Sequence, residues 1–256
     1  MPTTRQVRRR FLGQHFDLAG ARLLEIGAMD SPTLPEFEPP VRYLDWFSRD
    51  ELIELHGDNE RRRPERIVEV DYTVKRVDFS SAVSDRFELA IANHVIEHVP
   101  DAIRWLQEID KLTTDDGALF LSVPDRRYTF DYLRPESTLP DLLRAHDLRL
   151  EVADYYQVLS SVLYHRPVRA ADAWSGRLRE KLGQARFSVP EAMRRAREMS
   201  SDYSGVHCHV FTRASFERLF DELAESGLIS WRISAVDDVA RDSNEFHVLL
   251  RKPGTD

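Results

Sequence analysis

Five short apolar runs in the first half of the chain place the strongest limit on its fold. Each run is nearly continuous instead of alternating, and each ends in a polar or turn residue. Strands of a parallel sheet that is covered on both faces have this character, because neither face meets solvent. The predicted strands are 22–26, 41–44, 66–70, 87–92 and 118–123. The sequence therefore predicts an α/β fold.

Helix signals connect and follow these strands. Asp101 can cap a helix between the fourth and fifth strands, which makes a β-α-β unit. Thr212 can cap another helix near the end of the chain. Two more strands are predicted at 229–236 and 245–251, and the short polar connection between them indicates an antiparallel hairpin. The expected sheet is seven-stranded and mostly parallel, with an antiparallel edge.

Residues 126–205 match no strand pattern and contain charged, helix-like stretches. We interpret them as an inserted helical cap between an N-terminal part of the core, 1–125, and a C-terminal part, 206–256. The cap holds 14 basic and 11 acidic residues. This balance is compatible with an anionic substrate and equally with a solvated helical surface.

Composition narrows the function classes. The chain has 44 acidic and 36 basic residues, and a net charge of -8 does not attract nucleic acid or anionic lipid. Its apolar runs fall far short of the roughly 20 residues of a membrane-spanning helix. A single cysteine, Cys208, excludes an internal disulfide and suits a reducing compartment. We expect a cytoplasmic protein with small-molecule partners, and its oligomeric state is left open.

The ends of the predicted strands indicate the kind of ligand. Ligands of open α/β sheets bind at the carboxyl ends of the strands. Gly27 lets a ligand approach the backbone closely. Asp45, 20 residues after Glu25, is placed to accept two hydrogen bonds from a ribose diol. This pair suggests a cofactor that contains a nucleoside.

Several of these motifs together resemble the class I S-adenosylmethionine-dependent methyltransferases. The matching segments are 23–27, the acid at Asp45, 92–101 and 116–124. The resemblance covers residues 21–125, and it implies a Rossmann-like fold, S-adenosylmethionine as cofactor and methyl transfer. Segments 123–131 and 207–212 are similar to a bacterial subgroup that is often linked to polysaccharide or glycosyl-transfer pathways.

The resemblance implies cofactor-binding roles for Glu25, Gly27, Asp45, Trp46, Asp71 and Asn93. Glu25 and Gly27 would flank the methionine tail, and Asp45 would hold the ribose. Trp46 would pack beside the adenine. Asp71 would reach the adenine amino group, a role for which Asp78 is a rival because the loop after the third strand is long.

The glycine turn departs from the family pattern. The family usually has Gly-x-Gly-x-Gly, and residues 27–31 keep only the first glycine. The side chain of Met29 could crowd the methionine moiety of the cofactor. This departure motivates an alternative, a catalytically inactive methyltransferase-like module with a binding or regulatory role. A pyrophosphate-binding dehydrogenase is disfavoured because the turn has too few glycines.

Histidines supply the candidate catalytic groups. Residues 94–98 match His-x-x-Glu-His, a zinc motif of one metalloprotease class, but Pro100 follows too soon for a sustained helix, and no metal site is assigned. Alternation in an extended segment would put His207 and His209 on one side.

Methyl transfer from a sulfonium mainly requires that the acceptor be positioned and water excluded. A hydroxyl acceptor benefits from a base with a pKa near neutrality, which histidine supplies. We expect His94, His207 and His209 to be the catalytic candidates. The predicted reaction is O-methylation of a small metabolite, sugar-containing or anionic, held between sheet and cap.

Overall fold

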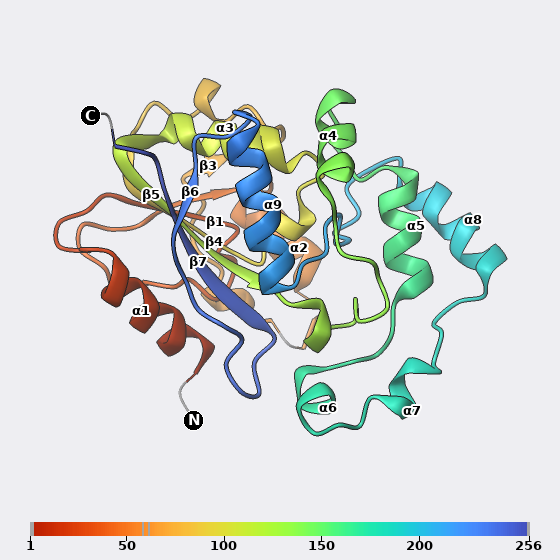
Figure 1. Cartoon of the computed structure of the whole chain (residues 1–256). Helices are drawn as coiled ribbons and strands as arrows, with labels where there is room; N and C mark the ends of the chain where they lie inside the picture. Colours follow the sequence, from red (N-terminus) through yellow and green to blue (C-terminus); the bar gives the residue numbers. More distant parts are fainter. Residues whose placement is uncertain (1–2, 58, 61, 255–256) are drawn as a thin grey trace.

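The computed structural model describes residues 3–57, 59–60 and 62–254. These residues form one seven-stranded sheet with helices on both faces (Figure 1). The strand order is β3-β2-β1-β4-β5-β7-β6, and β7 alone runs antiparallel to its neighbours. The strands are β1 (Leu23–Ile26), β2 (Arg42–Asp45), β3 (Tyr72–Thr73), β4 (Phe87–Asn93), β5 (Thr113–Pro124), β6 (Arg232–Val236) and β7 (Glu245–Arg251). The predicted sheet with its antiparallel edge is confirmed.

The helices fall into a core set and a cap set. The core helices are α1 (Thr4–His15), α2 (Arg49–His56), α3 (Ala102–Leu112) and α9 (Arg213–Glu225). The cap helices are α4 (Leu139–Asp147), α5 (Tyr155–Tyr164), α6 (Ala170–Trp174), α7 (Arg179–Leu182) and α8 (Val189–Met199). Short 3₁₀ turns are η1 (Pro64–Arg66), η2 (Phe79–Ser81), η3 (Ile96–His98) and η4 (Arg126–Tyr128).

Alternate residues of the central strands supply two separate cores. Leu89 and Ile91 pack with Phe11 of α1 on one face. Ala90 and Ala92 face the opposite core, which contains the apolar stripes of α3 and α9. Since side chains alternate across a strand, burial of both faces produces the continuous apolar runs of the sequence.

The predicted helix caps are confirmed. Asp101 accepts a hydrogen bond from the backbone N–H of Arg104 at 2.9 Å. Thr212 accepts one from the N–H of Ser215 at 3.2 Å, and the Ser215 hydroxyl accepts from the N–H of Thr212 in return. Each cap satisfies donors that the first helical turn leaves unpaired.

The prediction of a strand at 66–70 is wrong. Pro64 starts the 3₁₀ turn η1, and the N–H of Val68 then bonds to the carbonyl of Met29. This segment therefore runs beside the loop after β1. Pairing with β2 begins only afterwards and gives the two-residue strand β3.

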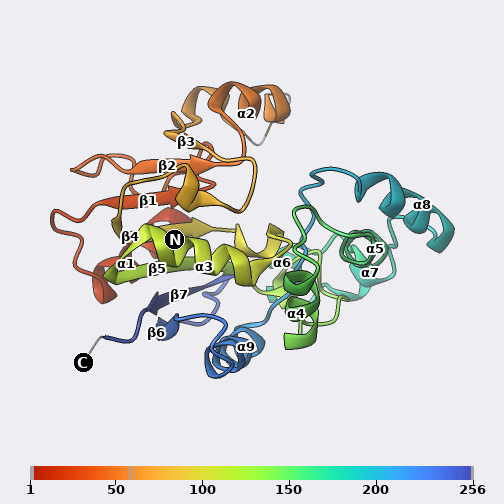
Figure 2. The same ribbon diagram turned by 90° about the horizontal axis from the view of Figure 1, so that it is seen from above.

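The cap helices lie beyond one end of the sheet (Figure 2). α5 and α8 pack on each other around Val158, Ala192 and Ala196. The chain returns from the cap beside β4's continuation, where the N–H of Cys208 bonds to the carbonyl of Glu97. The segment that returns from the cap thus lies at the carboxyl end of β4. In the described part of the chain, no helix has the length and apolar character needed to cross a bilayer.

Candidate functional site

The turn after β1 requires a glycine at its first position. Gly27 has φ +68°, and its N–H bonds to the carbonyl of Leu44 at 3.0 Å. A Cβ at this position would lie 2.9 Å from Cγ2 of Val95. Met29 also has a positive φ, of 47°. The turn is therefore pressed against the segment that follows β4, although two of the family's glycines are missing.

Glu25 fixes the loop after β1 through hydrogen bonds of its buried carboxylate. Its side chain is fully buried, and its carboxylate accepts from the N–H of Thr33 at 2.9 Å, from the Thr33 hydroxyl at 2.8 Å and from Nδ2 of Asn93 at 3.0 Å. Burial raises the pKa of Glu25 to about 6, against the effect of these hydrogen bonds. The carboxylate thus fixes the loop after β1 to the end of β4.

Asn93 presents an unpaired acceptor at the same edge. Its Nδ2 donates to Glu25 and, at 2.8 Å, to the Thr33 hydroxyl. These donations fix the amide orientation, and they leave Oδ1 buried with no hydrogen-bond partner among the described residues. A buried carbonyl oxygen of this kind favours a ligand that brings a donor, such as an ammonium group.

Asp45 and Trp46 lie at the end of β2 as predicted. Oδ1 of Asp45 accepts from the N–H of Phe47 at 3.1 Å, and burial raises the pKa of this carboxyl. Tyr203, between α8 and α9, stacks on Trp46 with ring centres 6.2 Å apart and meets Phe47 edge-on at 5.3 Å. The return from the cap therefore covers the expected ribose and adenine region.

Asp71 lies at the wrong end of its strand for the role that the resemblance implied. It precedes β3, pairs with Arg42 at 2.6 Å and accepts from the N–H of Tyr43. These contacts occupy it at the amino end of β3, because the strand starts later than predicted. Asp78, the rival, is exposed and follows the carboxyl end of β3.

His94 is clamped between two acids. Its Nε2 lies 2.6 Å from Oε2 of Glu245, and its Nδ1 lies 3.3 Å from Oε1 of Glu97. Burial lowers the pKa of His94, but the two carboxylates outweigh this effect and raise it to about 9. His94 is therefore an imidazolium at neutral pH, which argues against the predicted role as a base.

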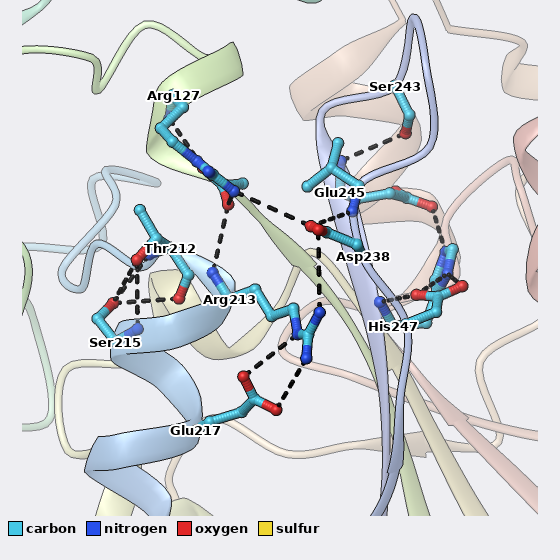
Figure 3. Close-up of polar contacts among 12 residues, drawn as sticks. Arg127, Thr212, Arg213, Ser215, Glu217, Asp238, Ser243, Glu245 and His247 are labelled. Carbon is cyan, nitrogen blue, oxygen red and sulfur yellow. Dashed lines mark hydrogen bonds and ion pairs between the residues drawn. The ribbon is translucent and has the colours of Figure 1, made fainter.

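Glu245 is the centre of a wider buried network. Arg8 of α1 reaches it at 2.6 Å and also donates to the Ser122 hydroxyl at 3.1 Å. His247 contacts the other carboxylate oxygen at 3.0 Å (Figure 3). Hydrogen bonds and charges from these partners and His94 hold the pKa of Glu245 far below its usual range despite burial. One carboxylate thus joins α1, β4, β5 and β7 beneath the strand ends.

A second cluster joins η3 to the chain returning from the cap. Glu97, His98 and His207 each place one atom that could bind a metal within 4.8 Å of the corresponding atoms of the other two residues. The His98 and His207 rings meet edge-on at 4.6 Å. Nδ1 of His207 lies 2.5 Å from Oδ2 of Asp131, which Arg134 holds at 2.9 Å. His207 is therefore oriented by a buried acid.

His209 is buried in the core and is not part of this cluster. Its side chain is 1% exposed, its ring packs near Phe211, and burial lowers its pKa to about 4. A neutral imidazole with no access to solvent packs the core, so the structure gives no support to a catalytic role for His209.

The sequence motif at 94–98 does not form a helical zinc pair. His94 has φ +53°, and only a 3₁₀ turn follows it. His94 contacts Glu245, whereas His98 faces His207. The two histidines thus point to different partners, and the expectation of no sustained helix is confirmed.

A cavity of about 590 Å³ lies between this cluster and the cap. His98 and His207 line it on the sheet side, and Arg186, Phe187 and Arg195 line it on the cap side. This space can hold a small organic molecule.

The comparisons with known proteins agree with this geometry. A model of the methyltransferase domain matches residues 4–223. The chain belongs to this methyltransferase family. A ubiquinone biosynthesis O-methyltransferase of Xanthomonas oryzae pv. oryzae is 31% identical over 127 residues, which are 47% of this chain and 50% of the relative. The chain thus spans about half the length of the curated relatives it matches.

Solved structures give a broader likeness. An S-adenosylmethionine-dependent methyltransferase from Mesorhizobium loti is 13% identical, with a TM-score of 0.49 over 95% of this chain and 96% of that one. A magnesium protoporphyrin IX methyltransferase from Synechocystis PCC 6803 with bound SAH is 9% identical, with a TM-score of 0.42 over 97% and 83%.

The methyl donor of this methyltransferase is S-adenosylmethionine, and the strand ends fit it. The turn at Gly27 leaves no room for a side chain, as a close backbone approach requires. Oδ1 of Asn93 is an acceptor suited to the ammonium of the methionine tail. Asp45 lies at the end of β2, where the resemblance predicts a carboxylate for the ribose hydroxyls.

Sequence reasoning gave no role to Arg8, Asp131 and Glu245, the charged groups that contact the predicted histidines or their partners, nor to Glu97 and His98 of the second cluster. Glu245 did carry a signal, because it is an acid at the start of a mainly apolar strand. Arg8 and Asp131 carried none, since each is one charge among several in a polar segment.

Proposed function

We propose that this methyltransferase moves the methyl group of S-adenosylmethionine to a hydroxyl of a small anionic acceptor, held between the core and the cap of residues 126–205. The cavity carries this proposal. It has imidazoles at the sheet end and guanidinium groups, from Arg186 and Arg195, at the cap end. Such a cavity suits a molecule with a hydroxyl at one end and an anion at the other.

The cap side favours an anionic group beside an apolar body. Arg195 lies 4.2 Å and Arg186 5.1 Å from the ring centre of Phe187. Glu191 partly neutralises Arg195 at 3.2 Å, whereas Arg186 has no carboxylate partner among the described residues. An anionic aromatic compound and an anionic sugar derivative both meet these requirements.

The position of the cavity supports transfer to oxygen. Val95 packs on the Gly27 turn, and Glu97 and His98 follow it directly, so the cofactor edge and the imidazole cluster are neighbours. The bound cofactor supplies an activated methyl group. The cluster of Glu97, His98 and His207 then receives the hydroxyl and facilitates its deprotonation, and the cap excludes water. The matched O-methyltransferase relative acts on oxygen according to its name.

Cofactor binding is tested by calorimetric titration with S-adenosylmethionine. Asp45→Ala should weaken binding by about 10-fold or more, because it removes charge-assisted hydrogen bonds of roughly 1.5–3 kcal/mol. Asp50→Ala, an exposed acid at the start of α2, is the control and should bind like the unchanged protein. Equal binding by both variants would remove Asp45 from the site.

Acceptor binding is tested with a panel of hydroxyl compounds, with and without a carboxylate or phosphate. Arg186→Gln should raise KM for an anionic acceptor by about 10-fold or more while affinity for S-adenosylmethionine stays unchanged. Arg194→Gln is the control, since Arg194 pairs with Glu198 outside the cavity. If no compound gains the mass of a methyl group although the cofactor binds, the protein is an inactive binding module instead.

A further inference from the structure

Two histidines that line the cavity, His98 and His207, and the buried Glu97 beside them have the arrangement of a metal site. His98 and Glu97 come from η3, and His207 comes from the chain returning from the cap. The fold brings these two segments together although they are far apart in sequence: Cys208, next to His207, donates to the carbonyl of His98, 110 residues away. We propose that Glu97, His98 and His207 bind a divalent transition-metal ion of the zinc type.

Both imidazoles are oriented with one nitrogen left for a ligand bond. Nδ1 of His98 lies 3.1 Å from the carbonyl of Val206, and because a carbonyl only accepts, Nδ1 carries the proton. Nδ1 of His207 likewise donates to Asp131 at 2.5 Å. In each ring Nε2 therefore keeps its lone pair. Metal-binding histidines usually have this second hydrogen bond, to a carboxylate or a backbone carbonyl.

Glu97 supplies the third, anionic ligand. Its side chain is fully buried, and neither carboxylate oxygen has a hydrogen-bond partner among the described residues. Oε1 lies 3.9 Å from Nε2 of His98 and 3.3 Å from Nδ1 of His94. His94 supplies one positive charge beside Oε1, but neither carboxylate oxygen accepts a hydrogen bond, so both keep lone pairs that a metal ion can use.

The ligand types select the class of ion. Two imidazoles and one carboxylate form a common catalytic zinc set with an open fourth position, whereas magnesium and calcium prefer oxygen ligands throughout. Ligand atoms of tetrahedral zinc lie ~3.4 Å apart, so modest side-chain rotations close this cluster onto an ion.

The open position would face the proposed acceptor. His98 and His207 line the cavity, so a hydroxyl in it can reach the ion. A metal lowers the pKa of a bound hydroxyl or water, and the proton then leaves to solvent. This chemistry refines the role given to the cluster under the proposed function, but ion binding itself does not depend on methyl transfer.

The test measures metal binding directly. The full chain is stripped with a chelator, dialysed and titrated with Zn²⁺ and, separately, Mg²⁺ by calorimetry, and Co²⁺ absorption reports the coordination. We expect one tight Zn²⁺ per chain, no Mg²⁺ binding and a visible Co²⁺ band. Glu97→Gln and His207→Gln should each weaken Zn²⁺ binding by at least 100-fold, and Asp131→Asn by about 10–100-fold.

His165→Gln is the matched control. His165 lines the same cavity and stacks on Phe130 but lies outside the cluster, so its loss should leave the Zn²⁺ affinity unchanged. His98→Gln replaces any cluster variant that does not fold, as judged by circular dichroism. Equal Zn²⁺ affinity in the cluster variants and the control, or no binding at micromolar Zn²⁺, overturns the proposal.

Methyl transfer is assayed on the same preparations to separate the two proposals. Tight Zn²⁺ binding at the cluster in a protein that methylates no acceptor supports the metal site and refutes the proposed function. Unchanged methyl transfer with no Zn²⁺ binding supports the function and refutes the metal site.

Discussion

Replacement of Glu245 by glutamine should destabilise the fold far more than loss of an ordinary ion pair. Its carboxylate is 2% exposed and contacts Arg8 at 2.6 Å, His94 at 2.6 Å and His247 at 3.0 Å. A neutral amide leaves Arg8 and the two imidazoles without their shared anion. Breaking a buried pair in this way costs about 3–5 kcal/mol.

The change is measured by calorimetric melting and urea denaturation at pH 7. At about 2–4 °C per kcal/mol for a chain of this size, Glu245→Gln should lower Tm by roughly 6–20 °C. Glu198→Gln removes an exposed pair with Arg194 at 2.7 Å and should change the free energy of unfolding by at most about 1 kcal/mol.

The pH dependence gives a second readout. The pKa of Glu245 is lower in the folded chain than in the unfolded one, so its contribution is complete above pH 4.5 and is lost as the pH falls below that value. The difference between the unchanged protein and Glu245→Gln should therefore shrink in acid. If Glu245→Gln melts within 2 °C of Glu198→Gln at pH 7, measurement precision being ~1 °C, the reasoning about this network is wrong.

Three further predictions concern single groups. His94 should titrate near pH 9 in NMR spectra. Because its pKa is raised in the folded state, its contribution to stability is present below about pH 6.5 and is lost as the pH rises through 9. A titration near pH 6.5 would contradict the effect of the two neighbouring carboxylates. Gly27→Ala should abolish tight binding of S-adenosylmethionine and lower the free energy of unfolding by more than the roughly 1–2 kcal/mol that positive φ alone costs. Gly20→Ala measures the cost of positive φ separately, because Gly20 has φ +69° and open space around it. Equal losses of stability in the two variants would exclude the contact with Val95. Cys208 should resist thiol reagents in the native protein, since burial raises its pKa to about 12; rapid labelling at neutral pH would show that the cap opens.

The positions of the candidate cofactor residues at the strand ends could be predicted from the sequence, because each is local to an apolar run. Gly27, Asp45 and Asn93 each follow an apolar run directly, and the carboxyl ends of parallel strands meet at one edge. The placement of Asp71 at the end of the third strand is wrong, because the segment after Pro64 forms a 3₁₀ turn and β3 begins only at Tyr72.

The histidine roles could not be predicted in this way. The protonation of His94 is set by Glu245, 151 residues away, and the burial of His209 is set by packing against other segments. A pKa depends on neighbours in space, and sequence spacing does not report them.

The sequence by itself determined the α/β class, the two helix caps, the antiparallel edge and the likeness to methyltransferases, since each depends on a local period, cap or motif. Only the tertiary structure decided that Arg8 bonds to Glu245, which lies 237 residues further along the sequence. It also decided that Asp131 orients His207 beside Glu97 and His98. These contacts exist because the sheet stacks α1 beneath β7 and the cap returns to β4. Their energies come from burial and charge at short distance, which are properties of the packed chain.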